Sequence, residues 1–320
     1  MARFARQQVI EHQIGPTGRF GLRLTHPDVE IRASDGDIAR VVIEFRISAE
    51  ADADVAFERI RYVVSQGAGR LEVNEPKLSG RGLGSLVSRL GIGSPNVSTS
   101  VRAEVPPGAE VTFDGVSADL RAEGLHGRQS YRSVSGDMVL ERAAGELRVR
   151  GISSSVSLRA DEPIRLEANT VSGDLSAVAP RFDELRVESI SGDVEIEGTL
   201  SSRRESRVET VSGDFRLGVV GGVTVEVRAL ASSVSVSLPH RSEGSRDRRR
   251  YVIGDGRAQL VFRSMSGDLV AHAARRTPVD APAPEPMDPG LEMEILRALE
   301  RGEIDVEEAV ARLARMASHA

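Results

Sequence analysis

The stretch Val171-Ser172-Gly173-Asp174-Leu175 contains a Ser-Gly-Asp phrase that occurs five times in this chain, each time between apolar residues. Three degenerate copies are centred on Ala118, which precedes the intact ones, and on Ser154 and Ser232, which lie between them. The central positions of all copies are 118, 136, 154, 173, 192, 213, 232 and 267. A spacing of about 20 residues is typical of stacked-repeat architectures, so we predict one rung per repeat.

Residues 185–196 show how a rung is built. Apolar and charged residues alternate on both sides of the phrase, which predicts two short strands with an apolar inner face. The inward residues are Leu185, Val187, Val194 and Ile196. Glycine at the corner supplies a backbone conformation that other residues resist, and Ser and Asp side chains bond the exposed backbone. We predict a mainly β fold, a parallel β-solenoid over residues 97–274, with structural turns at Gly136, Asp137, Gly173, Asp174, Gly192, Asp193, Gly213, Asp214, Gly267 and Asp268.

The N-terminal part, residues 1–96, is expected to cap this solenoid. Residues 19–47 alternate with period two around Asp35-Gly36-Asp37, which predicts antiparallel strands with a turn there. The apolar spacing over 52–65 predicts a short amphipathic helix, and the Gly/Ser-rich residues 75–96 predict an excursion from the sheet.

The C-terminal part changes character twice. Residues 241–250 are polar and arginine-rich, which predicts a loop, and residues 251–262 predict a β-hairpin turning at Gly254-Asp255-Gly256. Residues 275–289 form a proline-rich linker. Residues 290–317 have capping signals and apolar stripes that predict a small α-hairpin. Its partner-binding candidates are Leu291, Ile295, Leu299, Val310 and Leu313.

Composition excludes several classes of function. The chain has 320 residues, a net charge of −6 and no cysteine, so thiol nucleophiles, thiolate metal sites and a dedicated nucleic-acid binder are disfavoured. The polar N-terminus lacks the features of a signal peptide, and no apolar run is long enough for a transmembrane segment. We expect a cytoplasmic protein without a cofactor, with peripheral membrane contact left open.

The repeated Val-Ser-Gly-Asp phrase resembles that of the bacterial putative-adhesin family of unknown function, over about residues 20–272. The resemblance implies a parallel β-solenoid and brings no established catalytic residue. Residues 295–309 resemble short helical-hairpin modules often fused to such proteins, which are thought to mediate oligomerisation or protein contacts. Related architectures occur in bacterial envelope stress-response systems.

Two groups of charged residues offer chemistry. The column of corner aspartates could bind calcium, but with one Asp per rung we favour turn capping. On the outer face we predict two stacked columns, of which one contains only arginine and the other is mostly glutamate. The arginine column is Arg148, Arg165, Arg186 and Arg207, and the column beside it is Arg150, Glu167, Glu188, Glu209 and Arg228. We interpret the two columns as a solvent-exposed ladder of salt bridges. The alternative interpretation is a face that binds an anionic ligand such as a polysaccharide or a lipid headgroup.

The polar segment adds a second candidate anion site at Arg246, Arg248, Arg249 and Arg250. We predict a non-catalytic, adhesin-like scaffold whose helical hairpin recruits protein partners or a second copy. The first alternative is a binding module for anionic glycan or lipid, and the second is a carbohydrate-active enzyme.

Overall fold

The computed structural model describes residues 4–47, 60–76, 97–229, 232–245 and 248–274. These residues contain 22 β-strands, Ile60 is the one described residue in helical conformation, and all belong to one compact unit that ends at Ala274. The predicted mainly β class is confirmed. Among the described residues no helix has the length and apolar character needed to cross a membrane. The linker 275–289 and the predicted hairpin 290–317 lie outside the described residues.

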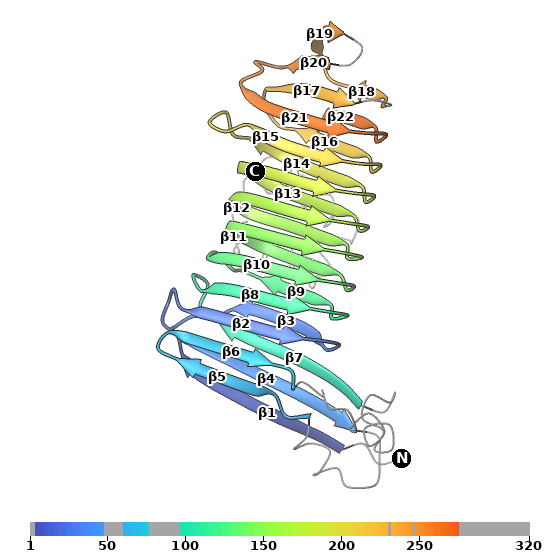
Figure 1. The fold of residues 1–320 in the computed structure, drawn as a ribbon. Helices are drawn as coiled ribbons and strands as arrows, with labels where there is room; N and C mark the ends of the chain where they lie inside the picture. Colours follow the sequence, from blue (N-terminus) through green and yellow to red (C-terminus); the bar gives the residue numbers. More distant parts are fainter. Residues whose placement is uncertain (1–3, 48–59, 77–96, 230–231, 246–247, 275–320) are drawn as a thin grey trace, which may run out of the picture. The chain divides into compact units, whose positions relative to one another are not determined.

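The strands form a single sheet that folds back on itself into two layers, seen as stacked rungs in Figure 1. The three longest strands each pass from one layer to the other, because their middle residues bend at irregularities in the pairing. They are β11 (Met138–Gly151), β12 (Val156–Thr170) and β13 (Leu175–Ser189). Their first halves lie in the second layer, and their second halves lie in the first layer.

The first layer continues above and below the second halves of these strands. On the N-terminal side it contains, in spatial order, β5 (Val63–Gly67), β6 (Arg70–Asn74), β2 (Arg19–Leu24), β8 (Glu110–Gly115) and β10 (Arg128–Ser133). On the other side follow β15 (Ser206–Thr210), β21 (Ala258–Ser264), β17 (Val223–Ala229), β20 (Arg248–Ile253) and β19 (His240–Ser245).

The second layer has the same construction. It begins with β1 (Phe4–Gln13), β4 (Ile38–Ile47), β7 (Val97–Val105), β3 (Asp28–Ala33) and β9 (Leu120–Glu123). Beyond the long strands it ends with β14 (Val194–Leu200), β16 (Phe215–Val219), β22 (Leu269–Ala273) and β18 (Val234–Val236). Going through this layer from β3 to β18, every strand pairs in parallel with the next, as a solenoid requires.

The core lies between the layers and is filled by the predicted inward residues. Leu185, Val187, Val194 and Ile196 are all at most 1% exposed. Most of the phenylalanines are buried there too, and Phe215 of β16 contacts Phe262 of β21 across the core with ring centroids 5.3 Å apart. This layer-to-layer packing buries the apolar face that an isolated rung would expose.

The expected antiparallel cap is only partly correct. Strands β1, β4 and β5 do pair antiparallel, but β2 and β3 form a parallel rung between β6/β7 and β8/β9. Alternation with period two reports a half-buried strand and not its direction, so residues 19–33 could not reveal this. The turn at Asp35-Gly36-Asp37 joins β3 to β4, which do not pair with each other.

The predicted helix over 52–65 is wrong at its C-terminal end, because Val63 and Val64 lie in strand β5, whereas Ile60 is helical. Just before them, the Gln8 side chain binds the Tyr62 backbone like a neighbouring strand, accepting from the N–H at 3.0 Å and donating to the carbonyl at 3.2 Å. The extended conformation suits β-branched residues, and β5 then turns back onto β6. Residues 52–59 and 77–96 lie outside the described residues.

The last rungs do not stack in chain order. Strand β21 lies between β15 and β17, and β22 lies between β16 and β18, so the Gly267 rung inserts before the Ser232 rung. The predicted hairpin between residues 251–253 and 260–262 is therefore wrong: β20 pairs with β17 and β19. The polar segment predicted to be a loop forms β19 and the start of β20. Charged residues suit an outermost strand, because they discourage pairing with another chain.

Candidate functional site

The corner aspartates link each rung to the next. The Asp174 carboxylate accepts the backbone N–H of Asp193 at 2.9 Å, and Asp193 does the same for Asp214 at 3.0 Å. Equivalent bonds join Asp119 to Asp137, Asp137 to Ser155, Asp214 to Asp268, and Asp268 to Ser233. Each of these carboxylates therefore has one oxygen engaged in capping a turn.

The corner serines and glycines complete this column. The Ser191 hydroxyl donates to the Val171 carbonyl at 3.1 Å, and Ser172, Ser212 and Ser266 bond the previous rung in the same way. A Cβ added at Gly192 would overlap the carbonyl oxygen of Gly173, and one at Gly213 would overlap that of Gly192. Glycine is thus needed because adjacent backbones approach closely. Of the five corner glycines, only Gly136 has a positive φ, at 153°.

The calcium alternative finds no built site in the described part of the chain. A hard cation needs several oxygens directed at one point. The corner aspartates instead stand one per rung with an oxygen on a backbone N–H. No three His, Asp or Glu side chains among the described residues gather as metal ligands do.

The predicted arginine column is wrong in register. Arg165 pairs with Glu146 and Glu184, while Glu167 lies between Arg148 and Arg186. Opposite charges therefore alternate from Arg148 through Glu167 to Arg186, and the next residue in this column, Arg207, has the same charge as Arg186. The neighbouring column contains Asn169 where Glu167 was expected. Its observed order is Arg150, Asn169, Glu188, Glu209, Arg263 and Arg228.

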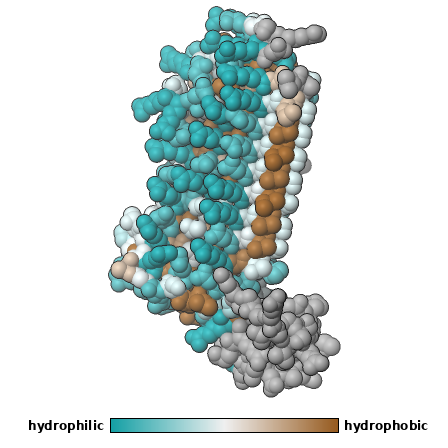
Figure 2. Space-filling view, in the orientation of Figure 1, coloured by the Kyte–Doolittle hydropathy of each residue, from teal (hydrophilic) through white to brown (hydrophobic). Residues whose placement is uncertain are grey.

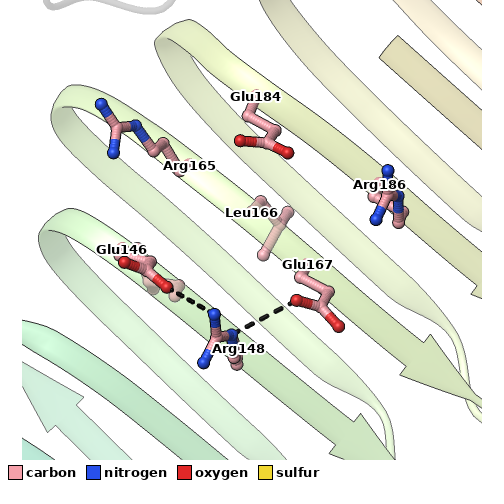
Figure 3. Close-up of a pocket in the computed structure, with 8 residues that line it drawn as sticks. Glu146, Arg148, Arg165, Leu166, Glu167, Glu184 and Arg186 are labelled. Carbon is pink, nitrogen blue, oxygen red and sulfur yellow. Dashed lines mark hydrogen bonds and ion pairs between the residues drawn. The ribbon is translucent and has the colours of Figure 1, made fainter.

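A shallow hollow of about 130 Å³ lies on this charged face (Figure 3). Arg148 bridges two glutamates there, contacting Glu146 at 2.8 Å on its own strand and Glu167 at 3.3 Å on the next. Arg165 and Arg186 line the same hollow, and neither has an ion pair with another described residue. The hollow thus combines a neutralised bridge with two available guanidinium groups.

The arginines of the polar segment are largely engaged. Arg248 of β20 and Arg228 of β17 both donate to the same Glu226 oxygen, at 2.7 and 2.6 Å. These two bonds lower the pKa of the Glu226 carboxyl to about 2. Arg249 donates to the Ser232 carbonyl at 2.9 Å. Arg250 pairs in register with Glu226 and Glu243, and Arg246 lies outside the described residues.

The partner-binding candidates Leu291, Ile295, Leu299, Val310 and Leu313 also lie outside the described residues. The sequence analysis predicts no role for the apolar residue that precedes each corner phrase. In the structure these apolar residues face solvent. They form the corner ladder, defined as Val116, Val134, Ile152, Val171, Ile190, Val211 and Met265.

Comparison with known families identifies this architecture. The model of the Toastrack DUF4097 family matches residues 16–270, and the chain therefore belongs to that family. This agrees with the expected resemblance to a family of unknown function with a β-solenoid fold. No curated protein matches the chain.

Several solved structures are similar over most of their length. A putative lipid binding protein from Parabacteroides distasonis is 11% identical, with 83% of this chain and 96% of that chain covered and a TM-score of 0.43. A putative adhesin from Bacteroides fragilis is 11% identical, covers 83% and 97%, and has a TM-score of 0.32. A putative cell adhesion protein from Clostridium sporogenes is 10% identical, covers 84% and 99%, and has a TM-score of 0.22.

Proposed function

We propose that this Toastrack protein is a non-catalytic, adhesin-like scaffold that holds interaction surfaces at fixed spacing. The observation that supports the proposal most directly is that charged side chains on the first layer form ion pairs between neighbouring rungs. Arg148 is divided between Glu146 and Glu167, so charged groups at the hollow bind neighbouring rungs together. A stack braced in this way suits a rigid support, because repeated cross-strand pairs stabilise the face without creating a reactive group.

In this proposal the C-terminal segment is the recruiting element. Its sequence predicts a helical hairpin with an apolar stripe, and a hairpin of about 30 residues is too small to bury a stable core alone. It should therefore dock on a protein partner or on a second copy. We propose a cytoplasmic scaffold in bacterial envelope stress or surface-associated assembly, which cell fractionation would test.

The experiment compares the full chain with the variant Ile295→Arg/Leu299→Arg. Light scattering would measure the mass, and affinity capture from the native host would give the partner list, with each captured protein retested in purified form. We expect the variant to lose mass or a direct partner. Glu303→Arg is the control, because it changes charge outside the apolar stripe. An unchanged mass and an unchanged partner list in the variant would contradict recruitment by this segment.

A second candidate function is binding of an anionic glycan or lipid headgroup, favoured by Arg165 and Arg186, which line the hollow and have no ion pair with another described residue. At about 130 Å³ the hollow is smaller than a typical ligand pocket, so it suits a single anionic group at most. Liposomes with anionic lipid and sulfated glycans would be tested at low salt. Arg165→Ala/Arg186→Ala should abolish binding, while Arg181→Ala, whose partner is Asp183, should not. Absence of binding by the wild type would remove this candidate.

The enzymatic alternative would use outer-face glutamates as acid and base. At the hollow, Glu146 and Glu167 each have an oxygen engaged in an ion pair with Arg148, whereas glycoside hydrolysis requires two carboxyl groups directed at the glycosidic bond. Activity against a broad glycan panel, lost in Glu167→Gln, would support this alternative over the scaffold.

A further inference from the structure

The corner ladder is an apolar surface without an assigned role. Its seven residues are 40–57% exposed, and Figure 2 shows them as a continuous brown stripe bordered by near-neutral residues. They occupy successive rungs, since Ser153 donates to the Val134 carbonyl, Ser172 to that of Ile152, and Ser191 to that of Val171. The stripe therefore repeats at about 4.8 Å, the spacing of adjacent strands.

The residues beside the stripe leave it free to make apolar contacts. The Ser191 and Ser212 hydroxyls turn back onto the carbonyls of Val171 and Ile190, so their bonding capacity is partly used within the rungs. The glycines that follow have no side chain. Burying the stripe against another apolar surface would therefore leave few polar groups without a hydrogen-bond partner, so the free-energy cost of desolvation would be small.

We propose that the corner ladder is the contact surface for a second copy of this chain, arranged antiparallel about a two-fold axis at Val171. A partner must present apolar side chains in step at every rung, and a second copy has this same repeat. Val171 is the fourth of the seven residues. A two-fold axis there places Ile152 opposite Ile190, Val134 opposite Val211, and Val116 opposite Met265. This proposal is independent of the C-terminal segment and goes beyond the scaffold function.

The area is sufficient for a modest self-association. At roughly 80 Å² for each half-exposed aliphatic residue, the ladder contributes about 550 Å² per copy and about 1,100 Å² in total. That total just exceeds the minimum of about 1,000 Å² for a specific interface and lies below the usual range of about 1,200–2,000 Å², which implies a dimer that dissociates on dilution.

The antiparallel arrangement follows from the ends of the stack. Strands β4 and β7 continue past the corner edge, since Val97–Thr99 pair with Phe45–Ile47 before β3 begins at Asp28. Figure 1 shows these strands reaching beyond the corner of the neighbouring rung of β2 and β3. Two copies side by side in parallel would bring these projections together. In the antiparallel arrangement each projection lies beside the partner's other end, where β18 has only 3 residues.

Cysteine cross-linking tests this geometry directly, because the chain has no cysteine of its own. In the full chain, Val171→Cys should form a disulfide-linked dimer under mild oxidation. Val116→Cys mixed with Met265→Cys should form the heterodimer, and neither variant alone should cross-link. Val220→Cys, which is 47% exposed outside the ladder, is the control and should remain monomeric. Cross-linking of Val116→Cys with itself would overturn the antiparallel arrangement.

Sedimentation between about 1 and about 100 µM measures the association itself. Ile152→Arg/Ile190→Arg should weaken dimerisation at least about tenfold, with circular dichroism confirming the fold. A wild-type chain that stays monomeric throughout would overturn the proposal. So would a dimer that survives this substitution. If that surviving dimer is lost in Ile295→Arg/Leu299→Arg, the C-terminal recruitment stands while the corner-ladder proposal fails.

Discussion

At the scale of single residues, the corner glycines determine how closely the rungs can stack. We expect Gly192→Ala to destabilise the protein by about 3 kcal/mol, because the new methyl would meet the Gly173 carbonyl and force the rungs apart. Urea unfolding followed by circular dichroism would measure the change. Gly67→Ala is the matched control: that glycine is exposed, its φ is not in the left-handed region, and a Cβ added there would have no atom within 4 Å. Equal midpoints for Gly192→Ala and wild type would contradict the close-approach explanation.

The corner aspartates allow a second test at this scale. Asp174→Ala removes the acceptor for the Asp193 N–H and should cost about 1 kcal/mol, since water can replace part of the bond at an exposed corner. Asp174→Asn keeps an acceptor oxygen and should cost less. Hydrogen exchange would report the difference at the Asp193 amide. Equal protection of that amide in wild type and Asp174→Ala would show that the carboxylate does not cap the turn.

The same aspartates predict the effect of removing calcium. Because each carboxylate caps the next rung, the melting temperature should be the same in excess calcium and in excess chelator. A chelator-dependent fall in wild type that Asp193→Asn abolishes would restore the calcium interpretation.

The sequence identifies the corner residues, but the conformational reason predicted for the glycines is wrong at every corner except Gly136. The Ser-Gly-Asp phrase correctly predicts turns in which the Asp side chain bonds to backbone, because short polar side chains at a turn have few other partners. A glycine that makes room for the next rung looks the same in sequence as one that adopts a positive φ. The exposure of Val171 and Ile190 could be predicted from the alternation of side chains along a strand. Ile190 is three residues from the buried Val187, and Val171 is three residues from the buried Ala168, so each points to the opposite face.

At the scale of elements, one ion-pair cluster joins β17 to β20. Because its pKa is lowered to about 2, Glu226 contributes stability above the usual carboxyl pKa of about 4.3 and loses it as pH falls towards 2. Glu226→Gln should therefore lower the melting temperature at pH 7, and the difference from wild type should shrink between about pH 5 and pH 2. Thermal melts across this range would show it.

Glu188→Gln is the matched control for this prediction. Glu188 lies between Asn169 and Glu209 and has no ion pair with a described residue, so removing its charge breaks no ion pair and should not lower the melting temperature at pH 7. A Glu226→Gln difference that is constant with pH would mean that the loss does not come from the carboxylate charge.

The charge columns show what limits prediction at this scale. Counting back from the corner glycine puts Arg148, Glu167 and Arg186 at equal distances, which is the observed register. Aligning similar residues instead placed Arg165 in that column, two residues out of step. A shift of two keeps every side chain on the correct face, so burial patterns cannot detect it. The corner phrase is the stronger marker of register.

At the scale of the whole described unit, the repeat predicted parallel stacking but not the order of the rungs. The interval of 35 residues between positions 232 and 267 contains the polar segment 241–250 and the predicted hairpin, which favours an insertion in a stack that follows chain order. The structure places the Gly267 rung between those of Gly213 and Ser232. Likewise the rung of β2 and β3 lies between rungs that follow it in sequence. Parallel rungs have similar apolar faces, so neighbours far apart in sequence can exchange places without a signal in the local pattern.

The most direct test of in-register stacking is the dipolar broadening between pairs of spin labels on engineered cysteines. Glu188/Glu209 and Glu209/Arg263 are adjacent-rung pairs, about 5 Å apart at the backbone, whereas Glu209 and Arg228 are two rungs apart, about 10 Å. We expect strong broadening for the first two pairs and weaker broadening for Glu209/Arg228. Broadening for Glu209/Arg228 that equals Glu188/Glu209 and exceeds Glu209/Arg263 would contradict this order of rungs.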